Sequence, residues 1–305
     1  MGSGVSKSRP STAKANAPKP ANAGAALGAV LSGAGITKVI LIRHANAQPR
    51  DPAAAAVEAG TVLKPDTPFA NAWTVGDLTR GLTPKGIEQA NGAKAWLDQY
   101  DVRAAASVSA LFLSTRPRFT HSPATVSSYL SVHLLCSPHH LLQVRAVIAS
   151  EATRAIATKD VMTADGFPKG GPGMLTLHTL HPSRSGTPEC EKMFDKIGYA
   201  TLDTYYADRS VEGCEGRGQA IFRHYMKKVT GELHELISGG VSNFPTKGNT
   251  IAVFGHAVFL NAVAVAVAEA MAIPEASEQV GTIELGEAQG ILCDGESRTI
   301  TLRTA

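Results

Sequence analysis

Six short runs of β-branched and apolar residues, separated by longer segments with helical periodicity, constrain the fold of this chain more than any other feature. The runs lie at residues 38–42, 144–149, 173–180, 250–254, 289–293 and 298–303. Each is bounded by turn-forming residues, which is typical of buried strands. Strands that alternate with helices form a mostly parallel sheet with helices on both faces. We therefore expect an α/β fold with three layers.

Four helical segments lie between these runs. The first begins at Thr83, a capping residue followed by proline at the first helical position. Its expected apolar face contains Ile87, Ala90, Ala93, Trp96 and Leu97. The other helices cover about residues 151–164, 217–238 and 257–272. The segment 167–216 is richer in glycine, proline and polar residues, and we interpret it as a flap over the functional site.

Composition excludes several classes of protein. Only 18% of the residues are charged and the formal net charge is +3, which argues against a dedicated nucleic-acid-binding protein. No apolar run approaches the roughly 20 residues of a membrane-spanning helix. The cysteines show no CxxC spacing, so we expect reduced thiols rather than zinc or a disulfide framework. They are Cys136, Cys190, Cys214 and Cys293.

Residues 1–36 are rich in Ala, Gly, Ser, Pro and Asn and contain no acidic residue. Such a segment cannot bury enough apolar surface to order itself, so we expect a disordered leader. Three interpretations stay open. It is a plain tail, an organellar transit peptide, or an N-myristoylated segment with Gly2 as acceptor, whose basic residues add attraction to a membrane surface. The expected location is cytoplasmic, or organellar if residues 1–36 are a transit peptide.

Residues 105–143 interrupt the expected domain at 37–305. They contain no Asp, Glu or Lys, eight Ser and four histidines, and they separate two copies of Val-Arg-Ala, at 102–104 and 144–146. Deleting the spacer with one copy joins a helix end directly to a strand, which is an ordinary connection. Because the spacer's residues are encoded by pyrimidine-rich codons, we interpret it as a non-native insertion from a retained intron. A genuine family-specific loop is the alternative.

Basic residues and histidines follow three of the expected strands. Arg43 and His44 end the first strand, Arg154 lies in the first turn of the helix after the second, and His256 follows 250–254. Open α/β sheets bind ligands at the carboxyl ends of their strands, where these side chains can converge. Guanidinium groups match phosphate oxygens, and helix N-termini add backbone donors. We call these four residues the anion cage.

The anion cage and its flanking residues resemble the histidine phosphatase (phosphoglycerate-mutase-like) superfamily. That family's strand ending in Arg-His-Gly is similar to residues 41–45, with Ala45 in place of glycine. Its Ser-x-x-x-Arg-Ala-x-x-Thr element is similar to 150–158, and its Gly/Ser-His pair to 255–256. An Arg-x-Leu-Thr-x-x-Gly stretch stands at 80–86. The resemblance covers about residues 37–305 without the insertion.

The resemblance implies a phosphoglycerate-mutase-like fold and a metal-independent phosphatase that needs no cofactor. His44 would be phosphorylated, Arg43 and Arg154 would clamp the phosphate, and His256 would stabilise its oxygens. A neutral imidazole can attack phosphorus while the other groups hold the charge. Two further residues lie close enough after the strand to help bind substrate, namely Asn46 and Arg50.

The chain departs from the family pattern in the residue that would protonate the leaving group. Mutases and many phosphatases of the family protonate the leaving group with a Glu after the third strand, and no such run follows 173–180. Four carboxylates of the flap are open candidates: Glu189, Glu191, Asp195 and Asp208. The short phosphohistidine-phosphatase branch lacks this acid, and the layout here is most similar to that branch. A phosphoramidate leaving group needs less acid help than an alcohol.

We therefore expect a phosphatase that hydrolyses a phosphate monoester or phosphoramidate, carried by a small molecule or by a phosphohistidine protein. Two alternatives stay open. One is a mutase or sugar-phosphate phosphatase whose acid comes from residues 187–208. The other is a phosphate-binding regulatory protein in which the insertion or Ala45 disables catalysis.

Overall fold

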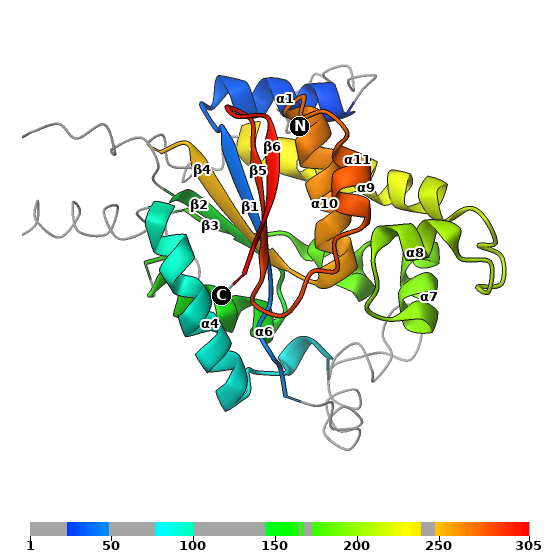
Figure 1. The fold of residues 1–305 in the computed structure, drawn as a ribbon, viewed down its shortest axis with the longest axis horizontal. Coiled ribbons are helices and arrows are strands. Elements are labelled where there is room, and N and C mark those ends of the chain that lie inside the picture. Colours follow the sequence, from blue (N-terminus) through cyan, green and yellow to red (C-terminus); the bar gives the residue numbers. More distant parts are fainter. Residues whose placement is uncertain are drawn as a thin grey trace, which may run out of the picture.

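The computed structural model describes residues 23–48, 77–100, 144–164, 166–167, 173–238 and 248–304. Within these ranges six strands form one sheet in the order β3-β2-β4-β1-β5-β6 (Figure 1). The strands are β1 (Lys38–Arg43), β2 (Val144–Ala149), β3 (Met174–Thr176), β4 (Thr250–Gly255), β5 (Gly290–Asp294) and β6 (Thr299–Arg303). β5 runs antiparallel to both of its neighbours, and the pairs β1–β4, β2–β4 and β2–β3 are parallel. The sheet is mostly parallel, as the sequence predicts.

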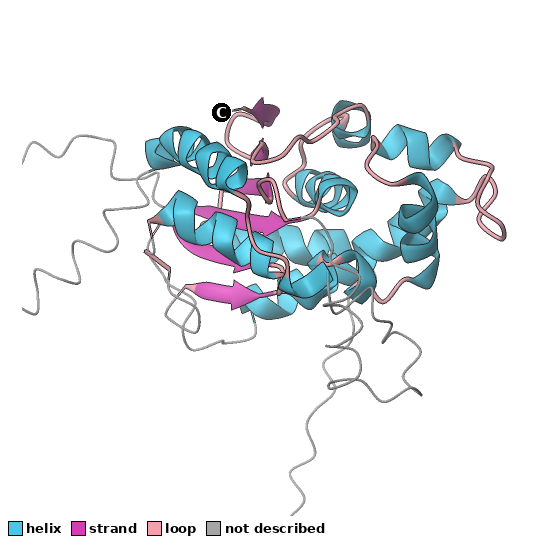
Figure 2. Ribbon diagram, turned by 90° about the horizontal axis from the view of Figure 1, so that it is seen from below, coloured by secondary structure: helices cyan, strands magenta, loops and turns pink. Residues whose placement is uncertain are grey.

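Alternate strand residues build two apolar clusters, one on each face of the sheet. In β1, Val39 and Leu41 belong to one cluster, and Ile40 and Ile42 belong to the other. The first cluster is covered by α1 (Ala23–Gly33), α9 (Gly218–Ser238) and α10 (Ala257–Ala270). The second is covered by α4 (Pro84–Leu97) and α6 (Thr153–Thr163). Figure 2 shows helices on both sides of the strands, so the predicted three-layer α/β architecture is confirmed.

The described part of the flap is a helical lobe. It contains two 3-10 turns, at His178–Leu180 and Pro182–Arg184, and the helices α7 (Pro188–Ile197) and α8 (Leu202–Ala207). Further short elements are the 3-10 turn Asp98–Tyr100, α11 (Ala276–Gly281) and a helical segment at residues 77–79. The predicted strand 173–180 is too long, because β3 is an edge strand that pairs with β2 over three residues and then turns.

The apolar face predicted for α4 is wrong at one residue. Ala90, Ala93, Trp96 and Leu97 are buried, but Ile87 is 45% exposed. Gly86, one position earlier in the helix, is buried instead, against the backbone of Asn46. This helix begins as predicted, because Thr83 caps it by accepting a hydrogen bond from the backbone N–H of Gly86 at 3.0 Å.

The prediction of a disordered leader is wrong for residues 23–36. Residues Ala23–Gly33 form α1, and Leu27 and Leu31 are buried in the cluster that α9 and α10 share. Alanine is the strongest helix former, and these two leucines lie one helical turn apart on a single face. Residues 1–22 and the insertion at 105–143 lie outside the described residues, so the interpretations of both stay predictions.

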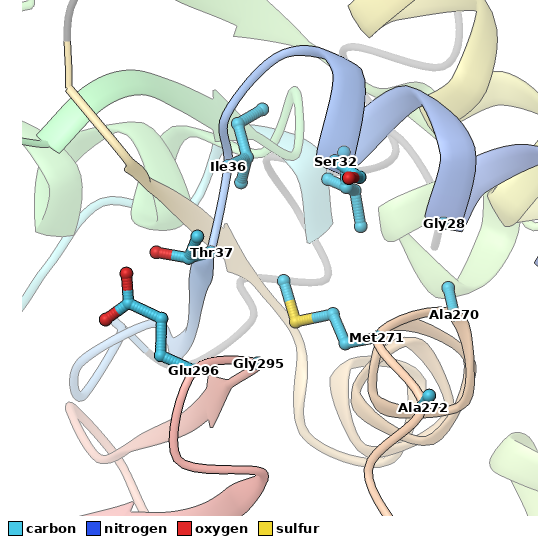
Figure 3. Close-up of a pocket in the computed structure, with 10 residues that line it drawn as sticks. Gly28, Ser32, Ile36, Thr37, Ala270, Met271, Ala272, Gly295 and Glu296 are labelled. Carbon is cyan, nitrogen blue, oxygen red and sulfur yellow. The ribbon is translucent and has the colours of Figure 1, made fainter.

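None of the described helices combines the length and the hydropathy that crossing a membrane requires. A surface pocket of about 270 Å³ lies between α1, the end of α10 and the β5–β6 turn. Ser32, Thr37, Met271 and Glu296 are among its lining residues (Figure 3). Thr37 precedes β1, so this pocket lies at the opposite end of that strand from His44.

Gly28 lets α1 approach α10 closely. A Cβ atom on Gly28 would lie 2.3 Å from the carbonyl oxygen of Ala270, a distance at which the backbone has to move. We expect Gly28→Ala to lower the free energy of unfolding by about 2 kcal/mol, because the overlap outweighs the gain in helix propensity. Urea unfolding followed by circular dichroism measures this change.

Gly231→Ala in α9 is the matched control. Apart from its chain neighbours and the backbone of its own helix, no described atom lies within 4 Å of a Cβ added there. The control is expected to raise stability by about 0.5–1 kcal/mol. Equal stabilisation by both substitutions would contradict the packing of α1 on α10.

Candidate active site

The strand ends that carry the anion cage meet at one edge of the sheet. β1 pairs with β4 in the register Arg43↔Gly255, and β2 pairs with β4 in the register Ala149↔Phe254. His44 and His256 each follow the last residue of their strands, so the two imidazoles become neighbours. Their ring centroids are 5.0 Å apart.

Arg154 lies at the centre of the anion cage, in the first turn of α6. Its Nε is 3.2 Å from Nε2 of His44, and its Nη2 is 3.2 Å from Nδ1 of His256. Only 2% of the residue is exposed. Burial lowers the pKa of Arg154, and the carboxylate of Asp77 opposes this effect. One guanidinium group therefore contacts both imidazoles.

His44 presents an unprotonated Nε2 to the cage. Its Nδ1 lies 2.8 Å from the carbonyl oxygen of Ala45, and a carbonyl can only accept, so Nδ1 carries the proton. Burial, with the charge of Arg154 beside it, lowers the pKa of His44 well below that of an ordinary histidine. The ring is therefore neutral at neutral pH, and the lone pair on Nε2 is a nucleophile.

Ala45 stands where the family that the sequence resembles has glycine, and it is buried. Its backbone N–H donates to Oγ1 of Thr158 at 3.0 Å, which ties the loop after β1 to α6. The residue is fully buried and belongs to the apolar cluster beneath α4 and α6. The extra methyl group thus contributes to the core.

Arg43 is held by two contacts and leaves one donor unused. Its Nη1 donates to the carbonyl oxygen of Leu285 at 2.8 Å, and its Cζ lies 4.2 Å from the ring centroid of Tyr199. In the part of the chain that the structure describes, the buried Nε of Arg43 has no hydrogen-bond partner, and the same is true of Arg80. A buried donor without a partner costs about 1–3 kcal/mol, which an acceptor atom of a bound anion would recover.

Three further residues beside the cage, which we call the Asp77 cluster, escaped the sequence analysis as site residues. They are Asp77, Arg80 and His181. The Oδ2 atom of Asp77 lies 2.7 Å from Nη2 of Arg154 and 3.0 Å from Nε2 of His181. Its Oδ1 lies 2.7 Å from Nη2 of Arg80. Arg154 also donates from Nη1 to the backbone carbonyl of Asp77.

His181 could have been found by the rule that identified His44 and His256, because it follows the strand predicted at 173–180. Arg80 opens the Arg-x-Leu-Thr-x-x-Gly stretch, and this motif is the signal that could have placed it in the site. Asp77 follows no strand and belongs to no motif. Only the folded chain brings it to Arg154.

The electrostatics of the site favour an anion. Burial opposes ionisation of Asp77, yet the hydrogen bond with His181 and the charges of Arg154 and Arg80 hold its pKa well below the usual range. Among the described residues of the cage and the Asp77 cluster, three guanidinium groups therefore face one carboxylate. The excess of positive charge matches a phosphate dianion.

The other two imidazoles of the site are also neutral. Burial lowers the pKa of His256 well below the usual value, with the charge of Arg154 adding to the effect. Burial also lowers the pKa of His181, although Asp77 opposes the shift. Nδ1 of His181 accepts from the backbone N–H of Ser183 at 3.3 Å, so its Nε2 carries the proton and donates to Asp77.

Two helices begin at the cage. The N-cap residues of α6 and α10 are Ala152 and His256, and among the described residues neither helix has a side chain that caps it. First-turn N–H groups and the positive end of the helix dipole both favour an anion. The sheet edge thus adds backbone donors to the charged side chains.

Asn46 lies next to the cage but is tied to its neighbours. Its Nδ2 donates to the Glu287 carboxylate at 2.9 Å, and its Oδ1 accepts from Oγ1 of Thr83 at 2.7 Å. A Cβ on Gly86 would lie 2.0 Å from its carbonyl oxygen, which explains the glycine of the Arg-x-Leu-Thr-x-x-Gly stretch. A role of Asn46 in substrate binding stays a prediction, and Arg50 lies outside the described residues.

The contacts of two of the four flap carboxylates lie within the flap itself. Glu191 accepts from Oγ of Ser185 at 3.1 Å, and Asp208 accepts from Ser210 and Val211. Glu189 and Asp195 are exposed on α7. In the described part of the chain, no group of three or more His, Cys, Asp or Glu side chains has the arrangement of a metal site.

No protein-family model and no curated protein sequence matches the chain. Several solved structures are similar to it. One is a candidate phosphohistidine phosphatase, SixA, from Agrobacterium tumefaciens, with 14% identity and a TM-score of 0.33 over 87% of this chain and 94% of that one. Another is a mycobacterial glucosyl-3-phosphoglycerate phosphatase in complex with VO3, with 12% identity and a TM-score of 0.38 over 88% and 97% of the two chains.

A third similar structure is the phosphoglycerate mutase from Bacillus anthracis, with 8% identity and a TM-score of 0.38 over 90% of this chain and 95% of that one. All three carry the names of phosphatases or mutases. At these identities and TM-scores the likeness assigns no activity to this chain, which has to be argued from the site itself.

The neutral imidazoles make stability depend on pH. Because His44, His181 and His256 have lowered pKa values, the unfolded chain takes up protons on them near pH 6.5, whereas the folded chain takes them up only at lower pH. The free energy of unfolding should therefore fall between about pH 7 and about pH 5, by up to about 1.4 kcal/mol per pH unit for each histidine. Urea unfolding across this interval measures the slope.

Two variants serve as controls. His181→Gln removes one of the three groups and should make the pH dependence shallower, whereas His224→Gln, on the exposed side of α9, should leave it unchanged. A free energy of unfolding that stays constant over the interval would contradict the neutral state of the buried imidazoles.

Proposed function

We propose that this protein is a phosphatase that hydrolyses a phosphate monoester or a phosphoramidate through a phosphohistidine at His44. The observation that carries the proposal is the contact between Nε2 of His44 and Nε of Arg154, 3.2 Å apart in a buried site. A lone pair on a neutral imidazole and a guanidinium fork stand side by side, which is the arrangement that phosphoryl transfer to nitrogen requires.

Substrate binding would replace contacts that the site makes internally. Phosphate oxygens would take the N–H groups of Arg154 that now point to the two imidazoles, and they would supply a partner for Nε of Arg43. Nε2 of His44 would then be free to attack phosphorus. In a buried site these charge-assisted hydrogen bonds are stronger than in water.

His256 is suited to stabilise the phosphate oxygens. Its Nε2 lies 3.1 Å from Oγ of Ser150, and a hydroxyl can donate or accept. When Arg154 turns to the phosphate, the ring can carry its proton on Nδ1 and donate to the same anion. Ser150 thus supports either tautomer, which gives a physical role to the first residue of the Ser-x-x-x-Arg element.

The substrate class includes small phosphorylated molecules and phosphohistidine proteins. A mutase with an acid from residues 187–208 has less support, because Glu191 and Asp208 are engaged within the flap. A regulatory protein that binds phosphate without turnover would use the same cage. Ala45 gives that alternative no support, because its methyl group is buried in the core.

The test is to trap the intermediate. The protein is incubated briefly with p-nitrophenyl phosphate, quenched in alkali, digested and analysed by mass spectrometry. We expect an acid-labile phosphate on the peptide that contains His44, and its loss in His44→Ala. The matched control His224→Ala removes an exposed histidine of α9 and should leave the phosphopeptide unchanged. Binding of inorganic phosphate without phosphorylation or turnover would instead support the regulatory protein.

A further inference from the structure

We propose that Asp77 is the general acid and base of the reaction, and that His181 is the residue that positions it. This assignment rests on the proposed phosphatase function. It gives the site an acid that lies outside the flap. The four carboxylates that the sequence analysis named as candidates all lie within the flap.

The geometry places Asp77 on the same guanidinium group as the nucleophile. Arg154 contacts Nε2 of His44 through Nε and Oδ2 of Asp77 through Nη2, at 3.2 and 2.7 Å. A phosphoryl group that binds Arg154 and meets His44 therefore comes within reach of the Asp77 carboxyl. Asp77 is only 2% exposed, so bulk water does not compete for the proton.

The carboxyl group is held in place from both of its oxygens. Oδ1 lies 2.7 Å from Arg80, and Oδ2 lies 3.0 Å from Nε2 of His181. Ser183 fixes the tautomer of His181 by donating its backbone N–H to Nδ1. A carboxyl group with fixed orientation is what general acid catalysis requires.

Substrate binding would favour the protonated form of the Asp77 carboxyl group. In the free protein the hydrogen bond with His181 and the charges of Arg154 and Arg80 keep Asp77 ionised, although burial opposes this. A phosphate dianion would take over the N–H groups of Arg154 and bring negative charge close to the carboxylate. Both changes raise the pKa of Asp77, since a like charge nearby disfavours ionisation. A phosphate group that enters as its monoanion can transfer its proton to the Oδ2 atom released by Arg154 and become the dianion, and Asp77 then carries this proton to the leaving oxygen.

Asp77 acts in both halves of the proposed reaction. Nε2 of His44 forms a bond to phosphorus while the bond from phosphorus to the leaving oxygen breaks, and that oxygen keeps the electron pair and takes the proton of Asp77. In the second half, the Asp77 carboxylate takes a proton from water as the water oxygen bonds to phosphorus. The P–N bond breaks, its electron pair returns to Nε2, and phosphate leaves.

An acid at this position extends the substrate class to esters of alcohols, whose alkoxides leave poorly without a proton. The experiment compares Asp77→Asn with the unaltered protein on p-nitrophenyl phosphate, which has a weakly basic leaving group, and on glycerol phosphate, which has a strongly basic one. We expect kcat to fall about 10²–10⁴-fold on glycerol phosphate and less than about tenfold on p-nitrophenyl phosphate. Phosphorylation of His44 by p-nitrophenyl phosphate should persist in this variant, which also shows that it is folded.

Asp77→Glu keeps the acid and should recover part of the activity on glycerol phosphate. Glu191→Gln is the rival variant, because burial raises the pKa of Glu191 and makes it the flap carboxyl best suited to carry a proton. It should retain both activities.

Equal losses on the two substrates in Asp77→Asn, a gain of activity in that variant, or a leaving-group-dependent loss in Glu191→Gln would each overturn the assignment. If the unaltered protein neither turns over nor forms phosphohistidine, the proposed function itself fails. If it does both and Asp77→Asn shows no leaving-group dependence, only the assignment of Asp77 fails.

Discussion

The structure depends on keeping one guanidinium group, that of Arg154, almost fully buried at the edge of the sheet. Burying an unpaired charge costs several kcal/mol, so each of its N–H groups needs an acceptor. Two imidazoles and Asp77 supply these acceptors. The requirement gives the Asp77 carboxylate a structural role, the pairing of a buried cation, beside the catalytic role that we propose for it. It also keeps the cage assembled in the absence of substrate.

The sheet provides the rigidity that this arrangement needs. β2, β4 and β1 are adjacent parallel strands, so their carboxyl ends deliver His44, Ser150 and His256 to one edge without long loops. Apolar clusters on both faces bury every residue of these three strands, which holds their register. α6 and α10 then start at the same edge, and Thr158 binds α6 to the backbone of Ala45.

Asp77 stabilises the buried cations of the site and also takes part in the proposed proton transfer. In the free protein its carboxylate pairs with Arg154, Arg80 and His181, and these contacts compensate its burial. An incoming phosphate would compete for the same cations. In our proposal, its binding therefore raises the pKa of the Asp77 carboxyl group. The histidines are neutral for the same electrostatic reason. A protonated imidazole beside Arg154 would repel the guanidinium group, and protonation of His44 would remove its nucleophilic lone pair.

The sequence by itself determined that there are six strands, although it made the third too long, and it determined the helices that follow β1, β2 and β4 and the positions of the four anion-cage residues. Buried strands and the residues at their ends can be recognised from local patterns. The sequence failed at α1, because a composition averaged over residues 1–36 conceals the single apolar face of Leu27 and Leu31. Only the tertiary structure decided the place of Asp77, which is separated from Arg154 by 77 positions and from His181 by 104. No local pattern encodes such a pairing. It arises because the folded sheet edge buries a cation that must find a carboxylate.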